Sequence, residues 1–303
     1  MERVLRSIIW KICFLFFWFI LPVSIFSLSG TAYPKEGEGC FKVNLFPREV
    51  YQGDICVVEV LISEGISSPS GEFQEKGLPF YEVERGKSFR ALIGVDMEAK
   101  PQVYKLIVSA KNSSGMVIQR ENSIRVLKKD FGTQRLTLPK KMVDLDNKTL
   151  KRVRKDIKGV KDIWPKATED RLWIGKFTRP LRGKVLSPFG VRRILNNKPR
   201  SPHSGVDLRG KMGEDILCSN TGIVVLVDEL YFNGKTVIVD HGQGLFTMYF
   251  HLSRINVKEG QRVEKGKVLG LVGSSGRATG PHLHWGARLH GARIDPLVLL
   301  EIK

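Results

Sequence analysis

Two histidines lie two residues apart near the end of the chain, in the stretch GPHLHWG. If this stretch is a strand, His282 and His284 lie on one face and Leu283 points to the other. Two imidazoles that converge on one face can bind a metal ion or transfer a proton. A solvated or hydrogen-bonded histidine pair is the alternative that this spacing alone leaves open.

A second set of polar side chains lies in SPHSGVDLRG, where His203 and Asp207 are four residues apart. Gly205 and Gly210 favour an extended segment here over a helix. His203, Asp207 and one histidine of the HLH pair would give three zinc ligands, with the fourth position left open for water. The other HLH histidine and His251, from TMYFHLSRI, could accept a proton from that water and stabilise an oxyanion. These residue types suit hydrolysis of an amide bond.

Three further side chains near these motifs have less specific interpretations. His241, in VDHGQG, is predicted to make a structural hydrogen bond in a turn. His290, in RLHGAR, is expected to be exposed in a turn. Tyr249 lies two residues before His251, so strand alternation places both on one face. It would then either position a substrate or belong to the core.

The N-terminus predicts export from the cytoplasm. Basic residues in MERVLRSIIWK precede the apolar run ICFLFFWFILPVSIFSLSG, as in a secretory signal. Gly30 and Ala32 fit a cleavage site after Ala32, which gives a signal peptide over residues 1–32. The run is also about long enough to span a bilayer, although Pro22 interrupts it. A retained inner-membrane anchor over residues 12–29 therefore stays open, and either segment would direct the rest to the periplasm or cell envelope.

The chain has 303 residues and a formal net charge of +18. Such a charge favours anionic partners, namely nucleic acid, acidic lipid or the anionic polymers of a cell wall. The sequence contains no RNP-type, zinc-finger or helix-turn-helix signature, so we expect no nucleic-acid partner. A basic, soluble surface without a specific partner is the alternative to wall polymers.

The length suggests two domains joined by a linker. The first exported part is predicted to be a β domain. Residues 40–128 form short apolar or alternating segments separated by turn sequences such as PREVYQGD and KNSSGM. This pattern predicts a β-sandwich of immunoglobulin-like (Ig-like) type, used as a spacer or binding module. In an oxidising compartment Cys40 and Cys56 could form a disulfide between two strands. Cys218 is expected to be a small buried residue.

Residues 129–172 have the composition of a basic linker with one amphipathic helix. Apolar residues recur at helical spacing in DNKTLKRVRKDIKGVKDIW, and basic residues occupy the other face. Asp146 or Asn147 would cap the helix at its start, and Pro165 would end it. We expect its apolar face to pack against a domain. The remaining part, residues 173–303, contains all six histidines.

Residues 178–297, approximately, resemble the lysostaphin-type zinc metallopeptidases (LytM-like, with a duplicated hybrid motif), which cut peptide bonds in bacterial peptidoglycan. The resemblance rests on four motifs in order: SPFGVRR, similar to S-x-[FY]-G-x-R; HSGVDLRG, with H-x-G-x-D; VIVDHGQGLFTMYFHL, with Y-x-H-L; and VKEGQRVEKGKVLGLVGSSGRATGPHLHWG, a glycine hairpin before H-L-H. One position departs from the family. An acidic residue commonly follows the aromatic residue after H-L-H, whereas here Gly286 follows Trp285.

The resemblance implies a role for each residue of the site. His203, Asp207 and His284 become the ligands of one Zn²⁺, and His251 and His282 become the catalytic histidines. It also implies an antiparallel β-sheet peptidase domain, so the expected fold is mainly β throughout.

The expected function is therefore a zinc-dependent endopeptidase that hydrolyses the peptide cross-links of peptidoglycan with metal-activated water. The main alternative is a non-catalytic cell-wall-binding regulator of other peptidoglycan hydrolases, and a purely structural zinc protein is a further one. Retention of all three ligands and both histidines favours the enzyme.

Overall fold

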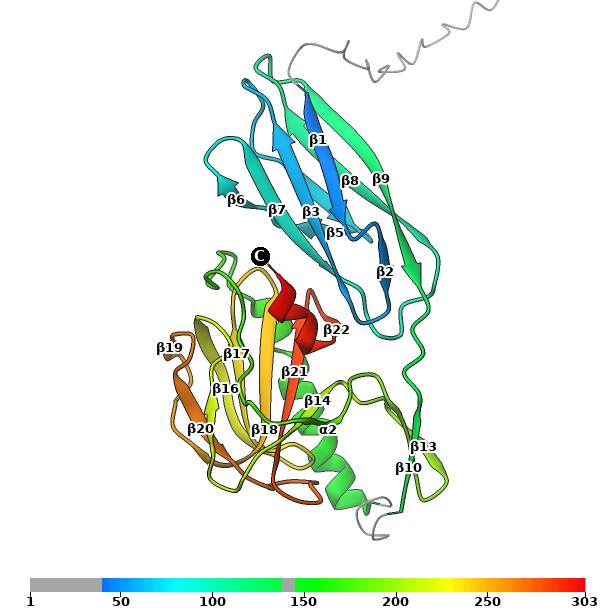
Figure 1. Cartoon of the computed structure of the whole chain (residues 1–303), viewed down its shortest axis with the longest axis vertical. Helices are drawn as coiled ribbons and strands as arrows, with labels where there is room; N and C mark the ends of the chain where they lie inside the picture. The colour runs from blue at the N-terminus through cyan, green and yellow to red at the C-terminus, as the bar shows by residue number, and fades with distance from the viewer. Residues whose placement is uncertain (1–39, 138–144, 303) are drawn as a thin grey trace, which may run out of the picture. The chain divides into compact units, whose positions relative to one another are not determined.

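The computed structural model describes residues 40–137 and 145–302. The fold over these residues is mainly β, as predicted, and most strands pair antiparallel (Figure 1). Among the described residues, no helix is both long enough and apolar enough to span a membrane. The predicted signal peptide or anchor, residues 1–32, lies outside the described residues.

Residues 41–127 form two sheets that enclose one apolar core. Within that range the first sheet has four strands in the order β1 (Phe41–Phe46), β3 (Ile55–Ile62), β7 (Ser88–Gly94) and β6 (Tyr81–Glu84). The second has five in the order β2 (Glu49–Tyr51), β9 (Val117–Leu127), β8 (Val103–Lys111), β4 (Ser70–Phe73) and β5 (Lys76–Leu78). Alternate residues of both sheets are buried between them, for example Val58 in β3 and Val108 in β8.

Cys40 and Cys56, which could have formed a disulfide, are not bonded to each other. Cys56 is a buried thiol whose Sγ donates to the carbonyl oxygen of Pro47 at 3.3 Å. The register between β1 and β3 keeps Cys40 and Cys56 apart, because Phe41 pairs with Ile62 while Cys56 lies near the other end of β3. Cys40 therefore lies opposite Ser63, seven residues from Cys56 along the strand pair, or roughly 23 Å at 3.3 Å per residue, too far for a disulfide. Cys218 is fully buried, as expected.

The helix predicted in the linker is present as α2 (Asn147–Lys161). Asp146 caps it by accepting a hydrogen bond from the Thr149 amide. The helix ends at Lys161, before the predicted stop, and Pro165 lies in the following 3₁₀ turn η1 (Trp164–Lys166). Val153 is buried, whereas Ile157 is exposed, so the apolar face is only partly covered.

The largest sheet positions the predicted site. Among residues 145–302 it has ten strands, and its main path runs β11 (Val185–Ser187), β14 (Gly205–Arg209), β21 (His282–Leu289), β18 (Leu245–Ile255), β17 (Gly234–Asp240), β16 (Gly222–Leu230) and β19 (Arg262–Val263). Its side strands are β15 (Asp215–Leu217), β20 (Val268–Val272) and β22 (Ala292–Ile294), and the 3₁₀ helix η2 (Pro296–Glu301) follows.

A smaller sheet contains the strands that precede and follow β11 in the sequence. The hairpin of β12 (Arg192–Leu195) and β13 (Lys198–Arg200) pairs in parallel with β10 (Thr133–Leu136) from the linker. The rings of Phe131 and Phe189 pack edge to face beside it, with centroids 5.8 Å apart. Strand β10 thus pairs with a hairpin whose first strand begins within the SPFGVRR motif.

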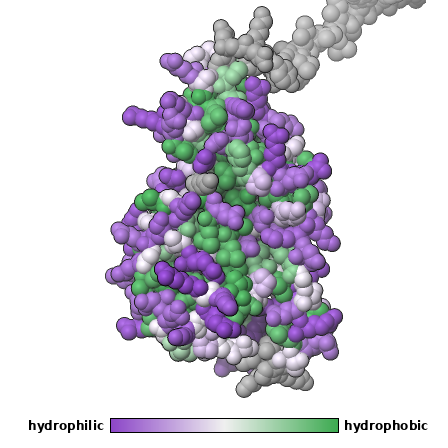
Figure 2. All heavy atoms as spheres, viewed as in Figure 1, coloured by the Kyte–Doolittle hydropathy of each residue, from purple (hydrophilic) through white to green (hydrophobic). Residues whose placement is uncertain are grey.

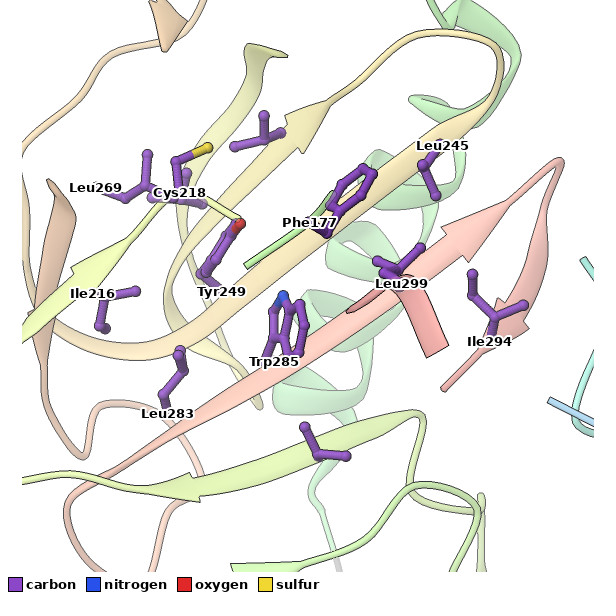
Figure 3. Packing of buried hydrophobic residues seen from close by; sticks show 14 of the residues in the cluster. Phe177, Ile216, Cys218, Leu245, Tyr249, Leu269, Leu283, Trp285, Ile294 and Leu299 are labelled. Carbon is purple, nitrogen blue, oxygen red and sulfur yellow. The ribbon is translucent and has the colours of Figure 1, made fainter. Parts of the chain in front are cut away.

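The two faces of the large sheet have different environments. One face forms the main core, where Tyr249, Leu283 and Trp285 are all fully buried. On the other face, side chains of β17 and β18 such as Phe246 pack against α2 and η1 through Val160 and neighbouring residues. Charged side chains lie outside these cores: Figure 2 shows hydrophilic residues spread over the visible face among apolar ones. Figure 3 shows Tyr249 and Trp285 pointing into the main core.

His241 lies within this core and makes the structural hydrogen bonds expected of it. Its Nδ1 donates to the Thr221 carbonyl oxygen at 2.8 Å, so Nε2 accepts from Thr247 Oγ1 at 2.7 Å. The ring is fully buried, and burial lowers the pKa of His241 to about 4. The folded protein therefore keeps this imidazole neutral at pH values where the unfolded chain binds a proton.

We predict that the free energy of unfolding falls as the pH drops from about 6.5 to about 4. In this window the unfolded chain takes up a proton that folded His241 does not bind, which costs about 1.4 kcal/mol per pH unit. The amide of His241→Gln can replace both hydrogen bonds but does not titrate. Denaturant unfolding at several pH values should give a shallower pH dependence for this variant, and an equal slope in both proteins would contradict the prediction.

Candidate metal centre

The pairing of β14 with β21 brings the two predicted ligand motifs together. In this antiparallel pair Asp207 lies opposite His284, and Arg209 lies opposite His282. The HLH segment is a strand, as predicted, with Leu283 in the core. His282 and His284 therefore share the opposite face.

The polar atoms of His203, Asp207 and His284 converge on one point. His203 Nε2 lies 2.9 Å from Asp207 Oδ1 and 2.9 Å from His284 Nδ1. His284 Nδ1 lies 2.8 Å from the same carboxylate oxygen. These three side chains, from two stretches distant in the sequence, form a group that could hold a metal ion.

Hydrogen bonding at His203 favours a cation at this point. Its Nδ1 lies 2.8 Å from the carbonyl oxygen of Pro188, which can only accept, so Nδ1 carries the proton. In the neutral ring, Nε2 then directs a lone pair at the carboxylate of Asp207, which also only accepts. A metal ion removes this mismatch, and two imidazoles with one carboxylate are ligands that suit catalytic zinc.

Electrostatics keep His284 and Asp207 in the protonation states that metal binding requires. Burial lowers the pKa of His284 to about 3, so this ring is neutral at pH 7. Burial alone would raise the pKa of Asp207, but its close polar contacts with the rings of His203 and His284 outweigh burial and hold this pKa well below its usual range. Neutral imidazoles and an ionised carboxylate are the forms that bind metal.

Two residues that the sequence analysis missed support the ligands. Arg193 Nη2 donates to Asp207 Oδ2 at 3.2 Å, which orients the carboxylate so that Oδ1 faces the histidines. The Phe250 ring stacks on the His284 ring, with the ring centroids 5.3 Å apart and an interplanar angle of 13°. Neither contact could be predicted from the alternation of residues around the HLH motif, because Arg193 and Phe250 belong to other segments of the chain.

His251 and His282 lie beside this group. The ring centroids of the two histidines are 4.8 Å apart, and His282 Nε2 is 3.8 Å from Asp207 Oδ1. The Nδ1 atom of His251 donates to the Ser275 carbonyl oxygen, and that of His282 to the Gly280 carbonyl oxygen, each at 2.8 Å. In the neutral rings Nε2 is then the atom that can accept a proton. Burial lowers the pKa of His251 to about 4, which keeps this ring neutral at pH 7.

A backbone irregularity brings His251 to this group. Its φ is +66°, in the left-handed region that non-glycine residues rarely adopt. Regular alternation would place His251 on the face of Tyr249, which is buried in the core and 2.9 Å from the amide of Ser219. Tyr249 is thus a core residue and not a substrate contact.

His290 differs from its predicted environment. It lies in the turn between β21 and β22, as expected, but the side chain is half-buried, with φ of +50°. Burial lowers the pKa of His290. It belongs neither to the metal-ligating group nor to the pair of His251 and His282.

Comparison with known proteins agrees with this geometry. Residues 201–296 match the family described as Peptidase family M23. A solved structure described as a putative peptidase M23 from Pseudomonas aeruginosa is 32% identical, covers 82% of this chain and 94% of its own, and superposes with a TM-score of 0.64. The chain belongs to peptidase family M23. The expected resemblance is thereby confirmed, and M23 peptidases are zinc-dependent.

Curated M23 relatives match the same part of the chain. A protein named peptidoglycan DD-endopeptidase ShyA, from Vibrio cholerae, is 36% identical over 115 residues, which is 38% of this chain and 27% of the relative. The DD-carboxypeptidase/endopeptidase Mpg from Neisseria meningitidis is 36% identical over 114 residues, or 38% of this chain and 26% of the relative. The matched part thus spans about a quarter of the length of these relatives.

We predict that the purified protein binds about one zinc ion per chain. His203→Ala and Asp207→Asn should each lose most of this metal, because each variant removes a ligand or its charge. His290→Gln is the matched control, since it removes a histidine outside the group. Elemental analysis after dialysis would measure the zinc, and full occupancy in both ligand variants would contradict the assignment.

Proposed function

We propose that this chain is a zinc-dependent endopeptidase that hydrolyses peptide cross-links of peptidoglycan. The observation that carries the proposal is the convergence of a His-Asp-His group with two further histidines whose Nε2 atoms can accept a proton. The names of the curated relatives support the substrate class.

In this proposal His203, Asp207 and His284 hold the zinc ion. Bound zinc acts as a Lewis acid and lowers the pKa of a water ligand to about 7. Arg193 holds the carboxylate of Asp207 in its ligating orientation through the contact at Oδ2. Phe250 fixes the plane of the His284 ring.

His251 and His282 supply the proton transfers. Their Nδ1–H groups are held by backbone carbonyl oxygens, so each ring can accept a proton from the attacking water only at Nε2. Once protonated, the same nitrogen can donate a hydrogen bond to the oxyanion on the substrate carbon, or pass the proton to the leaving amine.

The domain organisation and location belong to the same proposal. We assign residues 40–128 to an Ig-like module, 129–172 to the linker and 173–303 to the peptidase domain. Residues 1–32 would serve as a signal peptide, or residues 12–29 as an inner-membrane anchor, which places the enzyme in the periplasm or cell envelope. The net charge of +18 supports contact with anionic wall polymers.

A non-catalytic regulator that binds the cell wall is the second candidate. It would need neither a complete ligand set nor a pair of histidines beside it. Because all five side chains converge, catalysis is the better explanation.

We predict that His251→Ala keeps its zinc and loses activity by about 10²- to 10⁴-fold, the usual contribution of a general base. Digestion of purified peptidoglycan, with products identified by mass spectrometry, would measure the loss, and His290→Gln is again the matched control. Full activity in His251→Ala would contradict the role of this histidine. A zinc-loaded wild-type protein that releases no products would favour the regulator instead.

A further inference from the structure

Strand β18 has a β-bulge at the point where His251 lies. In the pairing of β17 with β18, Lys235 lies opposite Leu252. Two residues further along β17, Val237 lies opposite Tyr249, which is three residues from Leu252 along β18. Strand β18 thus has one extra residue in this interval, and His251 adopts its φ of +66° there. A bulge interrupts the ladder of hydrogen bonds and re-aims a side chain, so other groups must support it.

The hydroxyl group of Ser275 closes this bulge. Its Oγ accepts a hydrogen bond from the Lys235 amide at 2.9 Å and donates one to the Leu252 carbonyl oxygen at 2.7 Å. Ser275 belongs to neither paired strand, because it lies in the loop between β20 and β21. The hydroxyl therefore bridges two residues that face each other across the strand pair, next to the extra residue of β18.

The carbonyl group of the same residue orients the His251 ring. The Ser275 carbonyl oxygen accepts from His251 Nδ1 at 2.8 Å, so the lone pair of the neutral ring is on Nε2. Because the hydroxyl and the carbonyl belong to one residue, a shift of its backbone changes both contacts together. Ser275 thus contacts both the backbone around His251 and the nitrogen that sets the tautomer of its ring.

Close packing leaves little room for Ser275 to move. A Cβ atom on Gly234 would collide with Ser275 Oγ, and the φ of +62° at Gly234 also favours glycine. A Cβ atom on Gly273 would collide with the backbone from His251 to Ser253. The turn before β17 and the loop after β20 therefore both lie directly against the bulge.

We propose that Ser275 is a positioning residue whose hydroxyl holds His251 in the orientation that proton transfer requires. This proposal rests on the proposed function, since it concerns the histidine to which that function assigns the proton. The hydroxyl acts through the backbone of Lys235 and Leu252 and not by contact with the reacting atoms. A merely structural role would stabilise the fold but would not select one tautomer of His251.

The tautomer of His251 tests the proposal without any hydrolysis. Long-range ¹H–¹⁵N correlation spectra of the zinc-loaded full chain at neutral pH show which ring nitrogen carries the proton. In wild type we expect the proton of His251 on Nδ1. In Ser275→Ala we expect a mixture of both tautomers, because the loop that carries the accepting carbonyl is no longer held. His282 is the internal control, since its Nδ1 donates to the Gly280 carbonyl oxygen and should be unchanged.

Hydrolysis of a soluble cross-linked fragment of peptidoglycan gives the second readout. Ser275→Ala should keep its zinc and lower kcat about tenfold, as expected for the loss of one or two hydrogen bonds that support the transition state. KM should change little, because the hydroxyl supports proton transfer and not substrate binding. Ser275→Thr retains the hydroxyl and should restore both kcat and the wild-type tautomer. Ser274→Ala is the matched control, because Ser274 is the adjacent serine and is exposed.

Any of four results would overturn the proposal: His251 protonated at Nε2 in wild type, wild-type kcat in Ser275→Ala, a loss of kcat there without a change of tautomer, or no rescue by Ser275→Thr. If Ser275→Ala folds poorly, Ser275→Thr is compared with Ser275→Val, which has a similar shape and no hydroxyl. The wild-type tautomer in Ser275→Val would then overturn the proposal. Wild-type protein that has the Nδ1 tautomer but digests no peptidoglycan would overturn the proposed function instead.

Discussion

The register between β14 and β21 is the constraint on which the metal centre depends. Asp207 reaches His284 because the two residues are direct partners in this pair. Leu283 and Trp285 are both fully buried on the other face of β21, and burial of each stabilises the fold by about 2–3 kcal/mol. A slip of one residue would expose them and turn the histidines into the core. Apolar packing on one face thus fixes the ligand geometry on the other.

The backbone also sets which nitrogen each histidine presents. His203, His251 and His282 each donate from Nδ1 to a carbonyl oxygen, so their Nε2 atoms face the site. His284 instead directs Nδ1 at Asp207. Burial holds the pKa values of His251 and His284 far below neutrality. At neutral pH these two rings are therefore uncharged, as metal binding by His284 and proton acceptance by His251 require.

Local sequence patterns predicted those features that depend on neighbouring residues. The HLH strand follows from two-residue alternation, and the start of α2 follows from the Asp146 cap. Choosing His284 over His282 as the ligand required the resemblance to a family, because both residues share one face. The sequence left open whether Cys40 and Cys56 pair, because the answer depends on the register between β1 and β3, which spacing along the chain does not reveal.

The features missed at the site arise from non-local or irregular structure. His251 reaches the centre through a left-handed backbone conformation that breaks the alternation assumed for its strand. Arg193 contacts Asp207 only because the β12–β13 hairpin folds next to β14. Neither the left-handed conformation of His251 nor the contact of Arg193 with Asp207 can be predicted from the few residues that surround each of them in the sequence.

X-ray absorption spectroscopy of the zinc-loaded protein, combined with a crystallographic anomalous map at the zinc edge, tests the central claim most directly. We predict one zinc ion bound by His203 Nε2, Asp207 Oδ1 and His284 Nδ1 at about 2.0–2.2 Å, with a non-protein ligand completing the tetrahedron. Zinc held by other side chains, or by only one of these three, would contradict it.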